Sequence, residues 1–355
     1  MDHDEILCWL LENDPLRLEM LWRAADLTRR LEVGDAVHLR GLIEVSNVCQ
    51  RSCAYCGIAA CAPKVERYRM TREDILECAD RALEYGFGTV VMQAGEDPGI
   101  TGPWMAEIIA TLKQRTGLAI TLSLGERSED DLKAWRNAGA DRYLLRFETT
   151  DDELYRRIHP PVGSSSSSSA SDRIRQLERM RDLGYEIGTG VMVGIPGQTW
   201  ETLTQDILAF RHYDMDMIGI GPYLPSPGTP LDGTLGETLR GEAGARQVPN
   251  DSLTTLKAVA LTRLVCPRTN IPSTTALATA DPSQGRANGL SRGANVIMPN
   301  LTQPRYRELY QIYPGKAGLH ETADITVGRI REQIRLLGRT TGQGPGSSPR
   351  GKELS

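Results

Sequence analysis

The sequence predicts an α/β fold, a (β/α)8 barrel of the TIM type that follows an N-terminal helical extension. Two observations lead to this fold class. Short apolar, β-rich segments alternate with amphipathic segments of helical periodicity, and several of the apolar segments end in polar or glycine-rich residues. Eight apolar segments are expected to form strands, at residues 37–45, 89–93, 119–124, 142–146, 185–193, 217–220, 270–273 and 295–298.

Helices are expected between these strands. Thr71 is a suitable N-cap for the first of them, and Gly86 is a suitable stop. The others are expected at residues 102–115, 129–137, 172–183, 199–210, 251–264 and 285–292. Eight strand-then-helix units in order are the pattern of a barrel whose functional residues lie at the C-terminal ends of the strands.

The chain is expected to have three regions. Residues 1–35 carry apolar side chains at helical spacing and are divided by Pro15, which predicts two helices ahead of the barrel. Residues 36–339 form the barrel, and residues 340–355, rich in Gly, Ser and Pro, are expected to be a disordered tail. The serine tract at 164–171 is expected to be a flexible loop, and 233–250 a surface excursion.

The composition is that of a soluble globular protein, with 40% hydrophobic and 25% charged residues in a chain of 355. The net charge is −5 and no basic run is present, which argues against a nucleic-acid partner. No apolar run is long enough to span a bilayer, and the N-terminus lacks the basic region of a secretory signal. The sequence therefore predicts neither membrane association nor secretion.

Three cysteines lie together in the loop after the first expected strand: Cys49, Cys53 and Cys56, at spacing C-x3-C-x2-C. A 4Fe–4S cluster needs four ligands, so three thiolates leave one iron open, as is typical of a catalytic metal site. Zinc is the alternative, but it needs a fourth ligand, and Cys61 lies at an unsuitable spacing. Three of the seven cysteines in one loop favour metal binding over disulfides, and hence a cytoplasmic protein.

An aromatic residue, Tyr55, directly precedes the third cysteine of this loop. The arrangement resembles the cluster loop of radical S-adenosylmethionine (SAM) enzymes. The resemblance implies one 4Fe–4S cluster whose open iron is chelated by SAM, and electron transfer that splits SAM to a 5′-deoxyadenosyl radical. It also implies an oxygen-sensitive enzyme and an anaerobic host.

The end of the second expected strand offers partners for the amine of SAM. Gly95 allows the backbone to approach a ligand closely, and Glu96 and Asp97 supply acceptors. Radical SAM enzymes have a similar Gly-Gly-Glu segment at this place.

Four further residues are candidates for the rest of SAM. The Glu148 carboxylate can accept from ribose hydroxyls, and Arg173 can form a two-point pair with the methionyl carboxylate. By spacing alone Arg173 is an ordinary surface residue of a helix, and only the family resemblance assigns it this role. The same resemblance implies that the segments after the fifth and sixth strands contact adenine, through Met192 and Ile220.

Long segments of the barrel resemble one branch of these enzymes, the HydE-like maturases of FeFe-hydrogenase. The resemblance covers about residues 40 to 316. Its most specific parts are residues 67–71 (RYRMT), 93–98 (QAGEDP), 121–126 (TLSLGE), 138–149 (AGADRYLLRFET), 219–223 (GIGPY), 272–276 (PSTTA) and 293–300 (GANVIMPN).

The resemblance implies a role in assembling the active site of FeFe-hydrogenase. The expected substrate is a small organometallic complex, an iron-bound cysteine that carries CO and cyanide and is made by a partner maturase. Expected partners are other hydrogenase maturases and an electron donor such as ferredoxin or flavodoxin. The implied pocket residues are Gln93, Thr121, Arg146, Thr274, Thr275 and Tyr306. Residues 317–327 contain no cysteine, so the second cluster of some family members is not expected.

Other interpretations remain open. Biotin synthase has a similar barrel but needs further cluster cysteines, and Cys8, Cys61, Cys78 and Cys266 are poorly placed for them. A 3-methylornithine synthase-like mutase shares the Gly-Glu-Asp segment, although an amino-acid substrate favours a paired acid and base over the hydroxyls of Thr274 and Thr275. A non-catalytic iron–sulfur carrier or scaffold is the alternative of another class.

Overall fold

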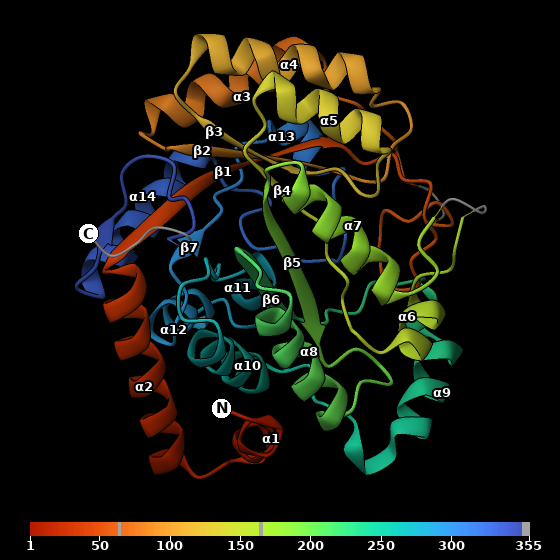
Figure 1. Cartoon of the computed structure of the whole chain (residues 1–355), viewed down its shortest axis with the longest axis vertical. Coiled ribbons are helices and arrows are strands. Elements are labelled where there is room, and N and C mark those ends of the chain that lie inside the picture. The colour runs from red at the N-terminus through yellow and green to blue at the C-terminus, as the bar shows by residue number, and fades with distance from the viewer. Residues whose placement is uncertain (63–64, 163–165, 350–355) are drawn as a thin grey trace.

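Parallel strands form the centre of the molecule. The computed structural model describes residues 1–62, 65–162 and 166–349. Seven strands pair in the order β6-β5-β4-β3-β2-β1-β7, and β8 pairs with the start of β1 (Figure 1). The strands are β1 (Ala36–Ser46), β2 (Thr89–Ala94), β3 (Ala119–Ser123), β4 (Arg142–Leu144), β5 (Glu186–Val193), β6 (Met217–Pro222), β7 (Val296–Ile297) and β8 (Thr340–Thr341).

A short extended segment closes the ring of strands. Met217 of β6 pairs in parallel with Asn270, and Pro272 pairs in parallel with Val296 of β7. Backbone hydrogen bonds join both sides, for example from the amide of Ile218 to the carbonyl of Asn270 at 3.0 Å. Residues 270–272 therefore occupy the place of the predicted seventh strand, and the predicted barrel is confirmed.

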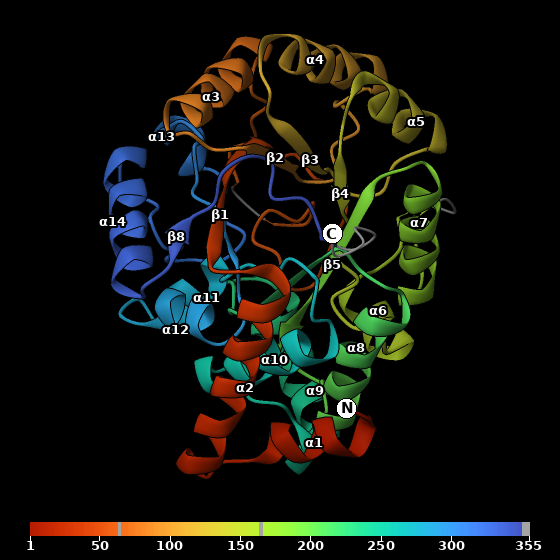
Figure 2. The ribbon, with the colours of Figure 1, turned by 60° about the vertical axis from the view of Figure 1, so that its left-hand side comes forward.

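Helices cover the outside of the barrel (Figure 2). Thr71 is the N-cap of α3 as predicted, and its side chain accepts from the amide of Asp74 while Asp74 reciprocates. The helices between strands are α3 (Arg72–Glu84), α4 (Gly102–Arg115), α5 (Glu129–Ala138), α6 (Asp152–Ile158), α7 (Ala170–Asp182), α8 (Trp200–His212), α9 (Thr234–Ala243), α10 (Ser252–Val265), α11 (Thr275–Ala280) and α12 (Gly285–Ser291). Two more follow β7, α13 (Pro304–Arg307) and α14 (Ala323–Leu336).

The N-terminal extension consists of two helices, α1 (His3–Leu11) and α2 (Pro15–Val33). Asp14 caps α2, and Pro15 occupies its first turn, where a missing N–H costs nothing. Both helices pack against α10, and Lys257 of that helix donates to the carbonyl of Leu10 at 3.0 Å. No helix of the described residues is long and apolar enough to cross a membrane.

The C-terminal segment differs from the prediction. Residues 340–349 were expected to be disordered, but they lie across the N-terminal end of the barrel. The carbonyl of Pro345 accepts from Thr89 at 2.8 Å and from Arg142 at 3.0 Å, and the carbonyl of Gly346 accepts from Arg40 at 3.0 Å. Buried arginines need acceptors, and the backbone of this segment supplies them. Residues 350–355 are outside the described residues.

Two loops are also more structured than expected. In the serine tract, residues 164–165 lie outside the described residues, but Ser167 is buried and Ser169 caps α7. Serine hydroxyls that cap a helix are ordered by the backbone amides they accept from. The excursion at 233–250 contains α9, which buries Leu239, and its end buries Val248.

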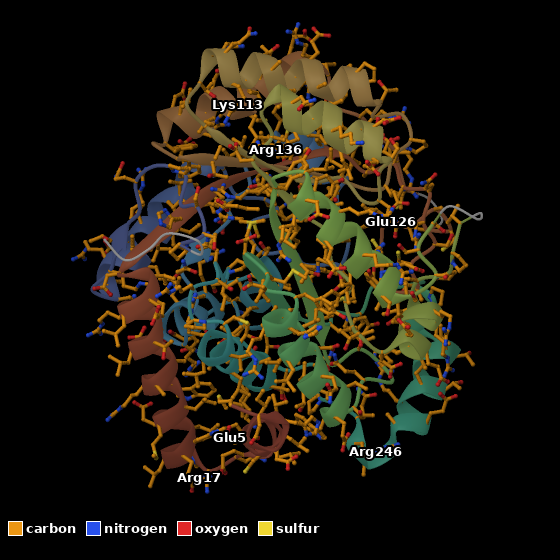
Figure 3. The ribbon with its side chains drawn as sticks, in the orientation of Figure 1. Glu5, Arg17, Lys113, Glu126, Arg136 and Arg246 are labelled. Carbon is orange, nitrogen blue, oxygen red and sulfur yellow. The ribbon has the colours of Figure 1, made fainter. Side chains whose placement is uncertain are left out.

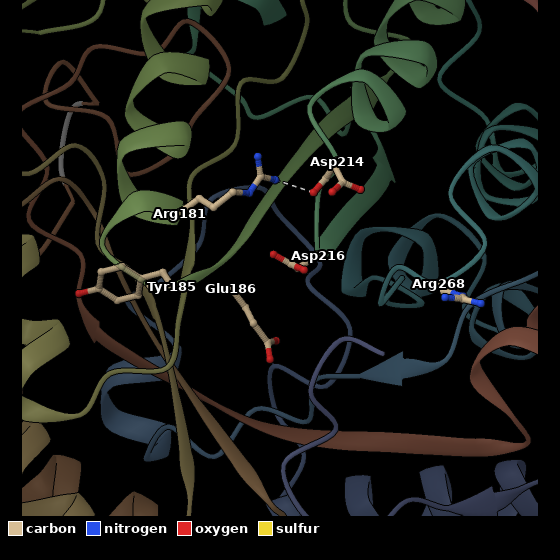
Figure 4. A pocket seen from close by; sticks show the side chains of 7 residues that line it. Arg181, Tyr185, Glu186, Asp214, Asp216 and Arg268 are labelled. Carbon is tan, nitrogen blue, oxygen red and sulfur yellow. Dashed lines mark hydrogen bonds between the residues drawn. The ribbon is translucent and has the colours of Figure 1, made fainter. Parts of the chain in front are cut away.

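A hollow of about 510 Å³ lies away from the strand ends where function was expected. It is lined by residues at the N-terminal ends of β5 and β6, including Glu186 and Tyr185 (Figure 4). Glu186 is paired with Arg142 at 2.7 Å. Catalytic residues of this fold lie at the opposite, C-terminal ends of the strands. We therefore take this hollow to be a structural feature of the barrel's N-terminal end.

Candidate active site

The cysteine loop follows β1 and is fixed on two sides. The amide of Gly95, at the end of β2, donates to the carbonyl of Ser46 at 2.9 Å. A Cβ at Gly95 would lie 2.3 Å from the carbonyl oxygen of Val48, so only glycine allows this approach. On the other side, the amide of Ala54 donates to the carbonyl of Ile158 at 2.9 Å. The loop is thus held between β2 and the end of α6.

The three thiols of the loop are half-buried and lie near one another. Burial raises the pKa of Cys53 to about 11, and it also raises the pKa of Cys49 and of Cys56, where the charge of Cys53 adds to the effect. Thiolates in such a place are unfavourable unless a cationic group binds them, and iron supplies that charge. The amide of Glu96 donates to the Cys49 sulfur at 3.4 Å. This donor set fits an iron–sulfur cluster.

The same thiols do not form a site for a single ion. Among the described residues, no three His, Cys, Asp or Glu side chains converge closely enough to hold one metal ion. A 4Fe–4S cluster does not require such convergence, because each cysteine binds a different iron atom.

Glu96 lies beside this loop as expected. One carboxylate oxygen accepts from Gln50 at 3.1 Å and the other from the amide of Glu126 at 3.0 Å. Glu96 is buried. Its carboxylate joins the cysteine loop to the end of β3, so it is placed at the junction where a bound SAM amine is expected.

Asp97 is engaged elsewhere, unlike its neighbour. Its carboxylate forms a two-point pair with Arg69, at 2.7 and 2.9 Å, and accepts from the hydroxyl of Ser46 at 2.7 Å. It also accepts from the amide of Gly99 at 2.8 Å. All these bonds fix the loops around β1 and β2. The expected SAM contact through the Asp97 side chain is thus not supported by its geometry, because its oxygens are already saturated.

Arg173 points inward from α7, and it is not the surface residue that its spacing suggested. It is buried, donates to the carboxylate of Glu126 at 2.9 Å and to the carbonyl of Arg146 at 2.5 Å. Arg51 approaches the same carboxylate oxygen of Glu126, at 3.5 Å. The Nε and Nη1 atoms of Arg51 are buried without a hydrogen-bond partner among the described residues. Sequence reasoning missed Arg51 and Glu126, although Glu126 ends one of the quoted segments.

Arg146 and Glu148 lie together just after β4. The guanidinium donates to both carboxylate oxygens, at 2.8 and 2.9 Å, and to the carbonyls of Val191 at 2.7 Å and Gly219 at 3.3 Å. Gly190 gives this side chain room, because a Cβ there would lie 2.8 Å from Arg146 Nη1. About 30% of the Arg146 side chain remains accessible. A buried carboxylate and a partly accessible cation thus meet inside the barrel.

The expected hydroxyls and adenine contacts lie on the neighbouring strands β5 and β6 and at the start of α11. Thr274 is the N-cap of α11, and its hydroxyl donates to the carbonyl of Ile220 at 3.1 Å. Thr275 begins α11 and is half-buried. Ile220 is fully buried and Met192 is half-buried.

Two expected pocket residues come from β2 and β3. Gln93 donates to the hydroxyl of Tyr310 at 3.1 Å. The hydroxyl of Thr121 is buried and has no hydrogen-bond partner among the described residues. A buried hydroxyl without a partner is costly, and this one is able to donate to a group bound inside the barrel. The prediction missed Tyr310, because nothing in its local sequence marks it.

Tyr306 does not join these residues. It lies on α13, where its hydroxyl donates to Asp74 of α3 at 2.7 Å and its ring packs at a tilt against Tyr68, with the ring centres 4.8 Å apart. This position is outside the barrel, so the expected pocket role of Tyr306 is corrected. Tyr310, in contrast, is buried beside Gln93, and Tyr313 lies close enough to Arg146 for the two side chains to interact.

A buried ion pair that the sequence did not reveal lies beside Tyr310. Lys316 donates to the carboxylate of Glu44, and its ammonium lies 5.3 Å from the centre of the Tyr310 ring. The other Glu44 oxygen accepts from Asn300 at 2.9 Å. These partners are far apart in the chain, so spacing could not have paired them.

Sequence comparison identifies relatives of the chain. Residues 43–209 match the model of the radical SAM superfamily. Over 338 residues the chain is 44% identical to the [FeFe] hydrogenase maturase subunit HydE of Thermotoga maritima, covering 95% of this chain and 91% of that protein. It is 29% identical to the 3-methylornithine synthase of Methanosarcina acetivorans, over 84% of this chain and 79% of that protein.

Solved structures share the same fold. The methylornithine synthase PylB superimposes with a TM-score of 0.77 at 24% identity, over 96% of this chain and 94% of that one. The maturase HydG of Carboxydothermus hydrogenoformans gives 0.77 at 18% identity, over 96% and 75%. At these identities the likeness concerns the fold alone. The identity and coverage of the Thermotoga relative, in contrast, show that the chain belongs to the HydE family of radical SAM hydrogenase maturases and is a radical SAM enzyme.

Proposed function

We propose that this enzyme acts in hydrogenase maturation on an iron–cysteine complex that carries CO and cyanide. The observation that carries the proposal is Arg146, a cation that is held rigidly inside the barrel yet remains partly accessible. Ligands such as cyanide, carbonyl and carboxylate are acceptors, and a fixed guanidinium is the donor that suits them. The unpaired hydroxyl of Thr121 adds a second donor.

The residues that would hold the cofactors surround one end of the barrel. Cys49, Cys53 and Cys56 would bind the cluster, and Glu96 and Arg173 lie where the amino-acid end of SAM would meet it. When bound, the reduced cluster and SAM supply a 5′-deoxyadenosyl radical. The protein's own part is to hold these groups in place and to keep water and oxygen away from the reacting atoms.

Arg146 also connects the two halves of the proposed site. Its guanidinium is paired with Glu148, the candidate for the ribose hydroxyls, and its carbonyl accepts from Arg173, the candidate for the SAM carboxylate. A residue that touches both cofactor candidates and faces the barrel interior can fix the distance between SAM and substrate. Such positioning contributes much of the rate in reactions of short-lived intermediates.

The second candidate function is a 3-methylornithine synthase-like mutase acting on lysine. The sequence likeness to the Methanosarcina enzyme favours it. A lysine ammonium needs an available carboxylate, but Glu44 is paired with Lys316 and Glu148 with Arg146. These pairings favour the maturase.

Turnover by the anaerobically reconstituted protein tests the proposal. The iron–cysteine–CO–cyanide complex, with SAM and a reductant such as reduced flavodoxin, should increase 5′-deoxyadenosine formation well above the substrate-free rate, whereas free lysine should not. The Arg146→Lys variant should lose this stimulation while retaining the cluster absorbance. Stimulation by lysine alone would replace the proposal with the mutase, and a Cys53→Ala variant provides the cluster-free control.

The proposal extends to partners. A ferredoxin or flavodoxin would deliver the electron to the cluster, and another maturase would supply the substrate. The family suggests both partners. The reaction also needs them, because the residues described above supply neither the electron for the cluster nor the iron–cysteine complex.

A further inference from the structure

Helix α2 is apolar on two opposite faces. One face carries the buried residues Leu18, Leu21 and Ala25 and packs against α10. The other face is open to solvent and carries four large apolar side chains, with exposed fractions of 79%, 64%, 55% and 74%: Leu16, Met20, Leu27 and Leu31. A surface helix of a globular protein normally has a single apolar face.

The exposed side chains form one continuous stripe, which we call the α2 stripe. Its members Leu16, Met20, Leu27 and Leu31 follow one another at spacings of four, seven and four residues, and the exposed Ala24 lies between Met20 and Leu27. Those spacings put all five on one side of a helix. Helix α2 lies at the edge of the molecule (Figure 1), and Figure 3 shows Arg17 near the beginning of that helix.

Charged residues follow one edge of this stripe in a regular order. They are Glu19, Arg23, Asp26 and Arg30, and the hollow of about 430 Å³ beside α2 is lined by all four. Within the helix they already pair, Arg23 with Glu19 at 2.7 Å and Arg30 with Asp26 at 3.6 Å. Read from either end, the order alternates between acid and base.

This order is complementary to itself when reversed. In two antiparallel copies of α2, Glu19 faces Arg30 of the other copy, and Arg23 faces Asp26. The same arrangement sets Leu16 against Leu31 and Met20 against Leu27, with Ala24 at the centre, where a small residue permits close approach. A parallel two-fold arrangement would instead put the charged edges of the two copies on opposite sides of the interface, where they could not pair. Self-complementarity about a two-fold axis is what an isologous interface requires.

We propose that the α2 stripe is a docking surface for a second copy of this chain, with the two α2 helices antiparallel about an axis near Ala24. The apolar side chains supply the binding free energy. The flanking charges set the orientation and contribute little affinity, because exposed ion pairs are weak. The inference is independent of the reaction proposed above, since α2 lies outside the barrel.

Sedimentation velocity of the full-length, cluster-loaded protein over a range of concentrations tests the proposal. We expect a monomer–dimer equilibrium that a double Met20→Glu, Leu27→Glu variant weakens by about 30-fold or more. The matched control is Ile325→Glu on α14, which introduces the same charge at a side chain that is 60% exposed and should leave the equilibrium unchanged. Thermal unfolding of each variant shows that the fold is intact.

A charge exchange tests the orientation. Glu19→Arg alone should weaken the dimer by roughly 5- to 30-fold, because it places two arginines together twice per dimer, and adding Arg30→Glu should restore most of the affinity. A wild-type chain that stays monomeric at 100 micromolar overturns the proposal. A dimer whose affinity is unchanged by the stripe substitutions would also overturn it, as would a monomer whose stripe binds lipid vesicles.

Discussion

Arg146 and Glu148 form a two-point ion pair across two residues of chain, with N–O distances of 2.8 and 2.9 Å. Glu148 has a left-handed backbone conformation, with φ of 65°, which is uncommon for any residue other than glycine. The carboxylate is buried, whereas the guanidinium is partly accessible. Backbone strain of this kind persists only where the surrounding contacts hold it in place. Here the strained residue places its carboxylate against the Arg146 guanidinium, which orients the cation inside the barrel.

Glu148→Gln should show what this pair contributes. The substitution preserves the volume but leaves Arg146 without a counter-charge, which costs about 1 to 3 kcal/mol of unfolding free energy, less than a fully buried pair because the guanidinium is partly hydrated. Denaturant unfolding measures this loss, and SAM cleavage should fall at least about tenfold. The control is Arg157→Gln, which breaks the exposed pair with Glu242 and should cost less than about 1 kcal/mol. Equal losses in both variants would contradict the expectation.

Two tyrosines distinguish the inside of the barrel from its outside. Tyr310→Phe should leave the half-buried amide of Gln93 without this acceptor, at a cost of about 0.5 to 1.5 kcal/mol, and should reduce turnover of the proposed substrate by about tenfold or more. Tyr306→Phe removes a bond to Asp74 on the outer surface, so turnover should stay within about twofold of wild type. Steady-state 5′-deoxyadenosine formation provides the comparison. If only the Tyr306 variant lost turnover, Tyr306 would be a pocket residue, as the sequence predicted.

The fold could be predicted because its signals are local. Alternating strands and helices, the N-cap at Thr71 and the polar strand ends were all readable from short windows, and residues 270–272 take their expected place even though they form only isolated bridges. The cysteine loop could be predicted for the same reason, because the spacing of its three cysteines is a local pattern that one iron–sulfur cluster imposes.

Other parts of the site depend on contacts that no window contains. The Glu44–Lys316 pair joins residues 272 positions apart. Tyr306 and Tyr310 are only four residues apart in the sequence. The local sequence therefore does not show which of the two tyrosines lies inside the barrel. The C-terminal segment was misread because its glycines and prolines suggest disorder, whereas its order comes from carbonyls that bind arginines of β1 and β4.

Asp206 should make stability depend on pH. It is fully buried, accepts from the amide of Thr150 at 2.6 Å and from Gln198 at 3.3 Å, and burial raises its pKa to about 7. The folded carboxyl therefore keeps a proton that the unfolded one loses above about pH 4. The stability it contributes is complete below pH 4 and is lost as pH rises to about 7.

An Asp206→Asn variant isolates this effect. The unfolding free energy of wild type minus that of the variant should fall between pH 4 and 7, by an amount on the order of a few kcal/mol, and should be constant above that range. Urea unfolding at several pH values measures the difference. A difference that rises with pH would mean that the three hydrogen bonds from Thr150 and Gln198 keep the carboxylate ionised in spite of its burial.

The C-terminal segment can be displaced without altering its own residues. A Cβ at Gly88 would lie 1.7 Å from the carbonyl oxygen of Gly344, so Gly88→Ala should push the segment away from the barrel end. Arg40 and Arg142 would then lose carbonyl acceptors, at a combined cost of about 1 to 3 kcal/mol. Gly117→Ala is the control, because no atom lies within 4 Å of the new methyl group there.

Hydrogen exchange and truncation complete this last test. Amides of residues 342–349 should exchange faster in Gly88→Ala than in wild type, while those of the strands stay protected. In a chain truncated after residue 342 the same substitution should cost almost nothing, because the atom it would strike has been removed. If Gly88→Ala destabilised the truncated chain as much as the full one, its effect would arise within the barrel and the segment would not be what holds the two arginines.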